Sequence, residues 1–353
     1  MITGSLDSEL ARSLEQLATD TRLPAPPEFA KGAWRPAPGA DPASYAIEVA
    51  KIAATTGHSS RAELAAALAQ SFRALPWVQA AAPTGDGYLT ITVTPQALAG
   101  SAARMATAGL ACANSTVLRG STAMVRPWPD MAAAPSWQRA WQEQAEAMTG
   151  RLAQAAGATV TFTSERERGS HRTTVVCDGS PVKPAVAYFG VSSVRYRLAR
   201  TLPGNTARLE QLSQVSSADE DPLHPVQQAH AAAASALRWA AELGLERDDP
   251  GERLAGLLSA PSERSMLGLL SWLPVRVAAA ARRHRPFELP RYLEQVSAAW
   301  LTCRQASPAL PFGGQSAPAD PATLAARLVL ADAVRAVLSA GLALTGIVAI
   351  DRL

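Results

Sequence analysis

The sequence contains few lysines, histidines, cysteines and aromatic residues. Only three of its 33 Lys and Arg residues are lysine, and it has five histidines and three cysteines. The cysteines are far apart and odd in number, which argues against a disulfide framework or a cysteine zinc site. Aromatic residues make up 5% and hydrophobic residues 48% of the chain, which favours helical cores over a large all-β fold. At 353 residues, two or three domains are expected.

Long apolar runs are also missing. Residues 1–5 have neither a basic segment nor an apolar core, so they do not predict a signal peptide. The one membrane-like stretch, residues 338–350, is too short to span a bilayer and predicts a buried helix. We therefore expect no membrane association and a reducing, cytoplasmic location. The net charge of +3 permits nucleic-acid binding without requiring it.

The first third of the chain predicts a small α+β domain. Residues 6–18 have helical periodicity with Asp7 as the expected N-cap, and the proline-rich residues 24–42 predict a connector. A helix is expected over 45–50, and a second should begin at Ser60, where Ser-x-x-Glu spacing is typical of a capping box. Residues 76–78 and 87–93 predict two strands around a turn at 85–86, and residues 95–108 a further helix.

The rest of the chain predicts a short α/β segment followed by helices. Strands are expected at 124–127, 158–163 and 173–177, with a helix over 137–156 that makes a βαβ unit. Pro274 should kink one of the later helices. Those helices are expected at residues 221–243, 251–259, 262–283, 288–305 and 321–344.

Several motifs in the last third resemble one known family. The segment Asp221–His230 opens a helix, and near the end Arg327–Leu338 leads to Gly341–Ile347. Between them lie Leu270–Val275, Pro290–Leu293 and Cys303–Arg304. In this order they resemble the C-terminal anticodon-binding (DALR-type) domain of arginyl-tRNA synthetases.

Two earlier segments resemble the same family. Tyr45-Ala46 and Gly85-x-Gly87-Tyr88-Leu89-x-Ile91 are similar to its additional N-terminal domain, which holds the elbow of tRNA. Residues 191–205 resemble the helix that follows the lysine loop of the catalytic domain. The resemblance implies a mainly α protein with three parts. These are an α+β domain over 1–110, a truncated Rossmann-like remnant over 111–205, and a DALR-type helical bundle over 206–353.

The catalytic motifs of these synthetases are missing from the 353 residues. The family holds ATP phosphates with a His-x-Gly-His motif and a Lys-Met-Ser-Lys loop, whose groups stabilise the transition state. No two histidines here are three positions apart, and Lys31, Lys51 and Lys183 form no Lys-x-x-Lys pair. We expect no catalytic residue, cofactor or metal, and no aminoacylation activity.

The candidate site residues fall into three groups. Five arginines lie within sixteen residues and predict phosphate contacts, although favourable interactions of arginine with a helix dipole explain the same pattern. The resemblance implies anticodon contacts, where Trp300 is either a stacking ring or a core residue and His230 either reads a base or is a satisfied core histidine. It also implies elbow contacts in the N-terminal domain. The phosphate candidates are Arg276, Arg282, Arg283, Arg285 and Arg291, the anticodon candidates Gln227, His230, Trp300 and Arg304, and the elbow candidates Tyr45, Tyr88 and Thr90.

These observations predict a tRNA-binding protein that resembles arginyl-tRNA synthetases but does not charge tRNA. Its expected partner is tRNA-Arg, and its expected role is an accessory or carrier factor in arginyl-tRNA-related metabolism. Two alternatives stay open. The chain is a protein docking module for a synthetase or another aminoacyl-tRNA-using enzyme, or it is a divergent enzyme of the arginine–tRNA ligase family.

Overall fold

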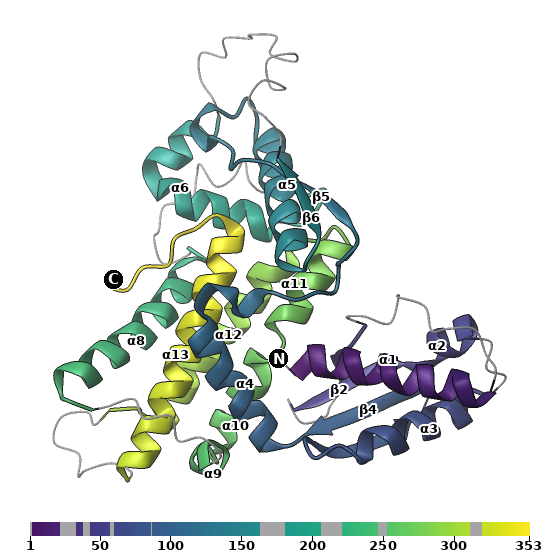
Figure 1. The fold of residues 1–353 in the computed structure, drawn as a ribbon. Helices are drawn as coiled ribbons and strands as arrows, with labels where there is room; N and C mark the ends of the chain where they lie inside the picture. Colours follow the sequence, from purple (N-terminus) through teal and green to yellow (C-terminus); the bar gives the residue numbers. More distant parts are fainter. Residues whose placement is uncertain are drawn as a thin grey trace. The chain divides into compact units, whose positions relative to one another are not determined.

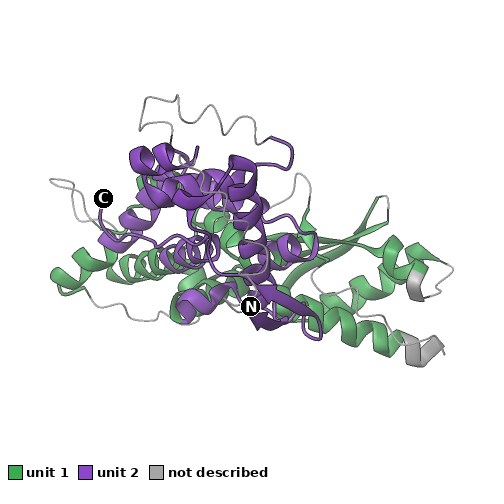
Figure 2. Ribbon diagram, turned by 90° about the horizontal axis from the view of Figure 1, so that it is seen from above, with its two compact units in different colours: residues 1–107, 236–275, 302–333 green, residues 108–235, 276–301, 334–353 purple. Residues whose placement is uncertain are grey.

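A computed structural model shows a mainly helical chain with two small sheets, which confirms the predicted fold class (Figure 1). It describes residues 2–21, 33–37, 43–56, 60–85, 87–162, 181–205, 221–245, 253–310 and 320–353. The chain divides into two compact units (Figure 2). Unit 1 contains residues 1–107, 236–275 and 302–333, and unit 2 contains residues 108–235, 276–301 and 334–353. The three consecutive segments expected from the sequence stay a prediction.

A four-stranded antiparallel sheet in the order β1-β2-β4-β3 forms the N-terminal part of unit 1. Burial alternates along β4, so that Leu89, Ile91 and Val93 are in the core. Helix α3 packs on β3 and β4, and α1 packs on α3. The predicted hairpin is therefore confirmed as β3–β4, although its first strand begins at Val78 and not at residue 76. The strands are β1 (Arg35–Pro36), β2 (Ser44–Glu48), β3 (Val78–Thr84) and β4 (Tyr88–Val93).

The N-terminal helices largely follow the sequence pattern. Helix α4 has the predicted bounds, and the Ser60 hydroxyl accepts a hydrogen bond from the backbone N–H of Glu63 at 3.2 Å, which confirms Ser60 as an N-cap. The helices are α1 (Ile2–Thr21), α2 (Val49–Thr56), α3 (Arg61–Arg73) and α4 (Pro95–Ala108).

Three local predictions in this part are wrong. Residues 45–48 belong to strand β2, because pairing with β4 over its full length overrides the helical periodicity. Asp7 lies inside α1, where its carboxylate accepts a hydrogen bond from the Trp34 indole at 3.0 Å instead of capping the helix. Within the expected connector, Arg35 and Pro36 pair with β2 as a short strand.

Unit 2 contains the predicted βαβ element. Strands β5 (Thr122–Val125) and β6 (Thr159–Phe162) are parallel and are joined by α5 (Trp137–Ala155). Helix α5 packs closely on β5 at Gly150, where an added Cβ atom would lie 2.3 Å from the Met124 carbonyl oxygen. Two short 3₁₀ helices, η2 (Gly109–Ala113) and η3 (Met131–Ala133), flank the first strand. The predicted strand at 173–177 lies outside the described residues.

Helix α6 (Lys183–Arg200) completes this part of unit 2. It is kinked at Gly190, whose φ of 81° lies in the region that favours glycine. Its apolar face packs with η3 and the start of α5 in a core that includes Met131, Trp137 and Leu198.

The last third of the chain is helical, as predicted. Pro274 does more than kink a helix, because a break at residues 271–272 separates α10 from α11 and Pro274 lies in the first turn of α11. Helix α13 is long and apolar enough to cross a bilayer, but 78% of its most apolar window is buried, as in a core helix. The helices are α8 (His224–Glu242), α9 (Leu254–Leu257), α10 (Pro261–Leu270), α11 (Leu273–Arg282), α12 (Glu288–Ala306) and α13 (Pro321–Thr345).

Candidate nucleic-acid interface

Four of the five predicted phosphate contacts form an exposed arginine patch in unit 2. We use this name for Arg282, Arg283, Arg285 and Arg291, which lie at the end of α11, in the following turn and on the first turns of α12. The side chains of Arg283 and Arg285 are 57% and 59% exposed. Arg276 differs, because it is partly buried on the body of α11 and its Nε atom has no hydrogen-bond partner among the described residues.

A tight C-terminal turn explains how three arginines come together. The N–H of Arg285 donates to the carbonyl of Ala280 at 2.9 Å, and that of His284 donates to the carbonyl of Ala281 at 3.1 Å. This pair of bonds is a Schellman motif, which needs a left-handed residue after the helix. His284 takes that place with a φ of 53°. The turn therefore places three exposed arginines, Arg282, Arg283 and Arg285, within four residues at the end of α11.

The charges of Arg283 and Arg285 are only partly balanced by their described contacts. Glu288 is the acidic group with a described contact, and its carboxylate lies 3.8 Å from Arg283 and 3.7 Å from Arg285. One carboxylate shared by two guanidinium groups leaves a net positive surface. Surface ion pairs of this length contribute little to stability, so the arginines can exchange Glu288 for a phosphate at small cost.

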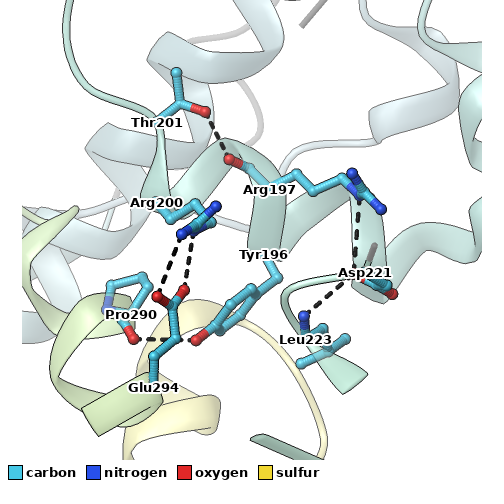
Figure 3. Close-up of polar contacts among 8 residues, drawn as sticks. All are labelled: Tyr196, Arg197, Arg200, Thr201, Asp221, Leu223, Pro290 and Glu294. Carbon is cyan, nitrogen blue, oxygen red and sulfur yellow. Dashed lines mark hydrogen bonds and ion pairs between the residues drawn. The ribbon is translucent and has the colours of Figure 1, made fainter. Parts of the chain in front are cut away.

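The start of α12, which carries Arg291, is anchored to α6 by polar contacts (Figure 3). The Tyr196 hydroxyl donates to the Pro290 carbonyl at 3.1 Å, and the Arg200 Nε atom lies 2.9 Å from the Glu294 carboxylate. Tyr196 and Arg200 belong to the segment that resembles the helix after the lysine loop. In this structure that segment, the second half of α6, contacts the first turns of α12.

Asp221 makes a second set of contacts with α6, at Arg197 and Ser193. Its carboxylate lies 3.8 Å from the Nε atom of Arg197 and accepts a hydrogen bond from the backbone N–H of Leu223 at 3.2 Å (Figure 3). It also accepts a hydrogen bond from the Ser193 hydroxyl. The Arg197 side chain is 8% exposed. A buried ion pair with these extra bonds is costly to break, so the junction of α6 and α8 is a structural support.

Gln227 and His230 hold the C-terminal segment of the chain. The Gln227 amide donates to the Val348 carbonyl and accepts from the Ile350 N–H, both at 3.0 Å. His230 Nδ1 lies 2.9 Å from the Ile350 carbonyl, and its Nε2 lies 2.7 Å from the Ser339 hydroxyl. Because a carbonyl only accepts, Nδ1 carries the proton and the neutral ring accepts at Nε2.

This burial has an electrostatic consequence for His230. Desolvation lowers the pKa of the imidazole below its ordinary value, although the Ile350 carbonyl and Asp351 oppose the shift. Both side chains thus have protein partners in this structure, and their contact with anticodon bases stays a prediction.

Trp300 and Arg304 lie four residues apart on α12. Trp300 is 4% exposed and its indole Nε1 atom is buried with no hydrogen-bond partner among the described residues. This burial favours the interpretation of Trp300 as a core residue over its interpretation as an exposed ring that stacks on a base. Arg304 is partly exposed in unit 1.

The elbow candidates lie on two strands of the N-terminal sheet. Tyr45 is fully buried, stacks on Trp272 with ring centroids 4.5 Å apart, and shares a hydrogen bond with the Ser271 hydroxyl. Burial raises the pKa of its phenol. Tyr88 lies beneath the Arg35 guanidinium, 3.9 Å from the ring centroid, and the Thr90 hydroxyl bonds Thr84 at 2.8 Å. Only Tyr88 and Thr90 therefore present side chains at the surface.

The sequence argument missed Arg126, which lies directly after β5. Ligands of parallel α/β units bind beyond the carboxyl ends of the strands, and this position was the available signal. Among the described residues no group of three His, Cys, Asp or Glu side chains is arranged to hold a metal ion.

Parts of the chain are similar to known proteins. Residues 226–353 match the family model of the DALR anticodon binding domain. The arginine–tRNA ligase of Micrococcus luteus is 32% identical over 175 residues, which cover 49% of this chain and 31% of that protein. The enzyme of Frankia alni is 35% identical over 164 residues, covering 46% of this chain and 29% of the enzyme. The chain thus spans about a third of the length of the curated relatives it matches.

A solved structure shows the same fold. The Thermus thermophilus arginyl-tRNA synthetase superposes with a TM-score of 0.56 at 14% sequence identity, with 100% of both chains covered. At this identity the likeness supports the fold alone.

Proposed function

We propose that this chain binds tRNA through the arginine patch. The chain carries a DALR anticodon-binding domain and is homologous to arginine–tRNA ligases over about half of its length. The observation that carries the proposal is the exposure of Arg282, Arg283 and Arg285 around one turn and of Arg291 on the following helix, where Arg283 and Arg285 share the carboxylate of Glu288. Guanidinium groups pair with phosphate oxygens in a bidentate geometry, which suits an RNA backbone.

We further propose that the bound tRNA is tRNA-Arg and that the protein does not charge it. The curated relatives act on arginine and tRNA by name. The 353 residues contain neither a His-x-Gly-His nor a Lys-x-x-Lys motif. These two observations support an accessory or carrier factor in arginyl-tRNA-related metabolism, which holds tRNA without forming an aminoacyl adenylate. We place this factor in the cytoplasm as part of the proposal.

A gel-shift panel of purified tRNAs tests the binding. The double variant Arg282→Glu/Arg283→Glu should weaken binding to all tRNAs about equally, since phosphate contacts carry no sequence information. The slope of log affinity against log salt should become shallower by roughly one unit per lost phosphate contact.

A matched control uses Arg104→Glu/Arg119→Glu, which makes the same charge change at exposed arginines outside the arginine patch. We expect a smaller loss of affinity for the control, from net charge alone. Equal losses for both double variants would assign binding to overall charge. Unchanged affinity in Arg282→Glu/Arg283→Glu would instead assign the arginines to the helix-dipole role.

A specific observation also favours the protein docking alternative. The βαβ element exposes apolar side chains, with Met124 51% and Phe162 71% exposed. A synthetase or another aminoacyl-tRNA-using enzyme is the partner we would test, by co-purification with the Phe162→Ser variant as control. Retained tRNA binding together with loss of this partner in Phe162→Ser would separate the two functions.

A further inference from the structure

A cavity of about 710 Å³ opens next to the arginine patch, within unit 2. One wall is strand β5 with Thr122, a second is α5 with Trp141 and Gln142, and the third is the turn after α11 with Arg282 and His284. The volume lies in the range of cavities that hold small organic ligands. The same turn therefore lines the cavity and displays the arginine patch.

The walls of the cavity combine a fixed aromatic ring with polar groups. The Trp141 indole donates to the Thr201 carbonyl at 3.1 Å, which fixes the orientation of the ring. Phe287 and Ala145 add apolar surface, and the Gln142 amide offers both a donor and an acceptor. A flat heteroaromatic group with hydrogen-bonding edges fits these walls.

The charges around the cavity favour an anion. Arg126 and Arg282 line it, and Glu146, the one acidic residue among its described lining residues, lies 3.2 Å from Arg126. The adjacent Arg283 and Arg285 add positive charge beside the cavity and share the one carboxylate of Glu288. A ligand with a phosphate at the rim and a planar apolar part inside matches both the arginines at the rim and the aromatic wall.

We propose that this cavity receives one unpaired nucleotide, a nucleoside monophosphate unit, of the RNA held by the arginine patch. The inference rests on the proposed function and adds a place for a base to the contacts with the backbone. Proteins that recognise RNA typically read bases that are splayed out of the stack and packed on aromatic rings. The phosphate of the unit contacts Arg282 at the rim, and the base enters along Trp141 and Gln142.

The position of His284 supports the same assignment. A non-glycine residue with positive φ is strained, and such residues gather at functional sites. Glycine would fill the Schellman position without strain, but it would remove the imidazole that lines the cavity between two arginines. The side chain offers a further hydrogen-bonding group to a phosphate or a ribose.

Filling the cavity tests the proposal with the full chain. Ala145→Phe places a ring in the cavity, and Ala66→Phe makes the same change on the exposed face of α3 in unit 1. Binding of a fluorescein-labelled single-stranded RNA and of a duplex RNA of equal length is followed by anisotropy. We expect Ala145→Phe to weaken single-strand binding roughly tenfold or more, with duplex binding and the salt slope unchanged. Ala66→Phe should leave all three unchanged.

A second variant covers the case in which Ala145→Phe fails to fold. Gln142→Glu keeps the size of the side chain and adds a negative charge, so it should also weaken single-strand binding. If Ala145→Phe folds, its single-strand affinity decides: a loss supports the proposal, and unchanged binding overturns it while leaving the arginine patch in place. If Ala145→Phe does not fold, the same two outcomes are read from Gln142→Glu.

A free nucleoside monophosphate separates this proposal from the proposed function. If wild type binds no RNA at low salt, the proposed function fails. In that case, if AMP binds to wild type and Gln142→Glu abolishes this binding, the cavity is still assigned as a nucleotide site. If AMP does not bind to wild type, the cavity proposal is overturned. If AMP competes with single-stranded RNA but not with duplex RNA, the cavity and the arginine patch are both in use.

Discussion

Replacing Trp300 distinguishes a core residue from a base-stacking residue. The indole is 4% exposed, so Trp300→Ala removes a large buried side chain from α12. Such truncations cost about 3–5 kcal/mol through lost transfer energy and the cavity left behind. For a unit of this size, each kcal/mol lowers the melting temperature by roughly 2–4 °C, so a fall of about 6–20 °C is expected.

A second substitution at the same position sharpens the test. The Nε1 donor of Trp300 has no hydrogen-bond partner among the described residues, and a buried unsatisfied donor costs about 1–3 kcal/mol. Trp300→Phe removes this donor and loses part of the ring, so the two effects oppose each other. We expect its unfolding free energy to stay within about 1–2 kcal/mol of wild type.

Urea denaturation followed by circular dichroism measures both variants, and the gel shift measures tRNA binding. A stacking ring predicts the opposite pattern, in which Trp300→Ala melts like wild type but loses about 1–3 kcal/mol of tRNA affinity. That pattern would refute the argument from burial. It would also show that α12 rearranges when RNA binds.

Three further predictions concern other parts of the chain. Because burial lowers the pKa of His230, the unfolded state takes up the proton first, and stability should fall as pH drops through about 6.5. His230→Gln should flatten this pH dependence in urea melts between pH 8 and 5, and an unchanged slope would contradict the argument. Gly150→Ala should cost roughly 1–3 kcal/mol or more because its Cβ atom meets the β5 backbone, whereas Gly256→Ala, with open space around it, should be neutral in the same melts. Arginine-dependent ATP–pyrophosphate exchange should stay at background, and activity above background would restore the enzyme alternative.

The regular elements that depend on local sequence were predictable. Helix α4 begins at a proline and ends as expected, and Ser60 caps α3 because capping needs only neighbouring residues. Residues 45–48 were assigned wrongly because their strand depends on β4, forty or more residues away. Long-range pairing of this kind overrides local propensity.

The candidate site divides in the same way. The arginine patch follows from residues close together in the sequence, and only the turn at His284 had to be added by the structure. The burial of Trp300 and the partners of Gln227 depend on segments far away along the chain. The cavity beside Arg282 was unpredictable because it needs β5, α5 and the turn after α11 together.

The hydrogen bonds between Gln227 and the backbone of Val348 and Ile350 limit how a ligand can bind this side chain. The amide of this residue donates to one backbone carbonyl and accepts from one backbone N–H, and the edge of a nucleobase presents the same pair of groups. The protein's own main chain therefore occupies this position as an internal competitor. A base that enters must exchange two hydrogen bonds for two, so the exchange yields little net energy. Selection among bases would then arise from the difference in hydrogen bonding between the incoming base edge and the displaced peptide groups. Removing the last few residues of the chain would raise the affinity of Gln227 for a base while reducing the discrimination between bases.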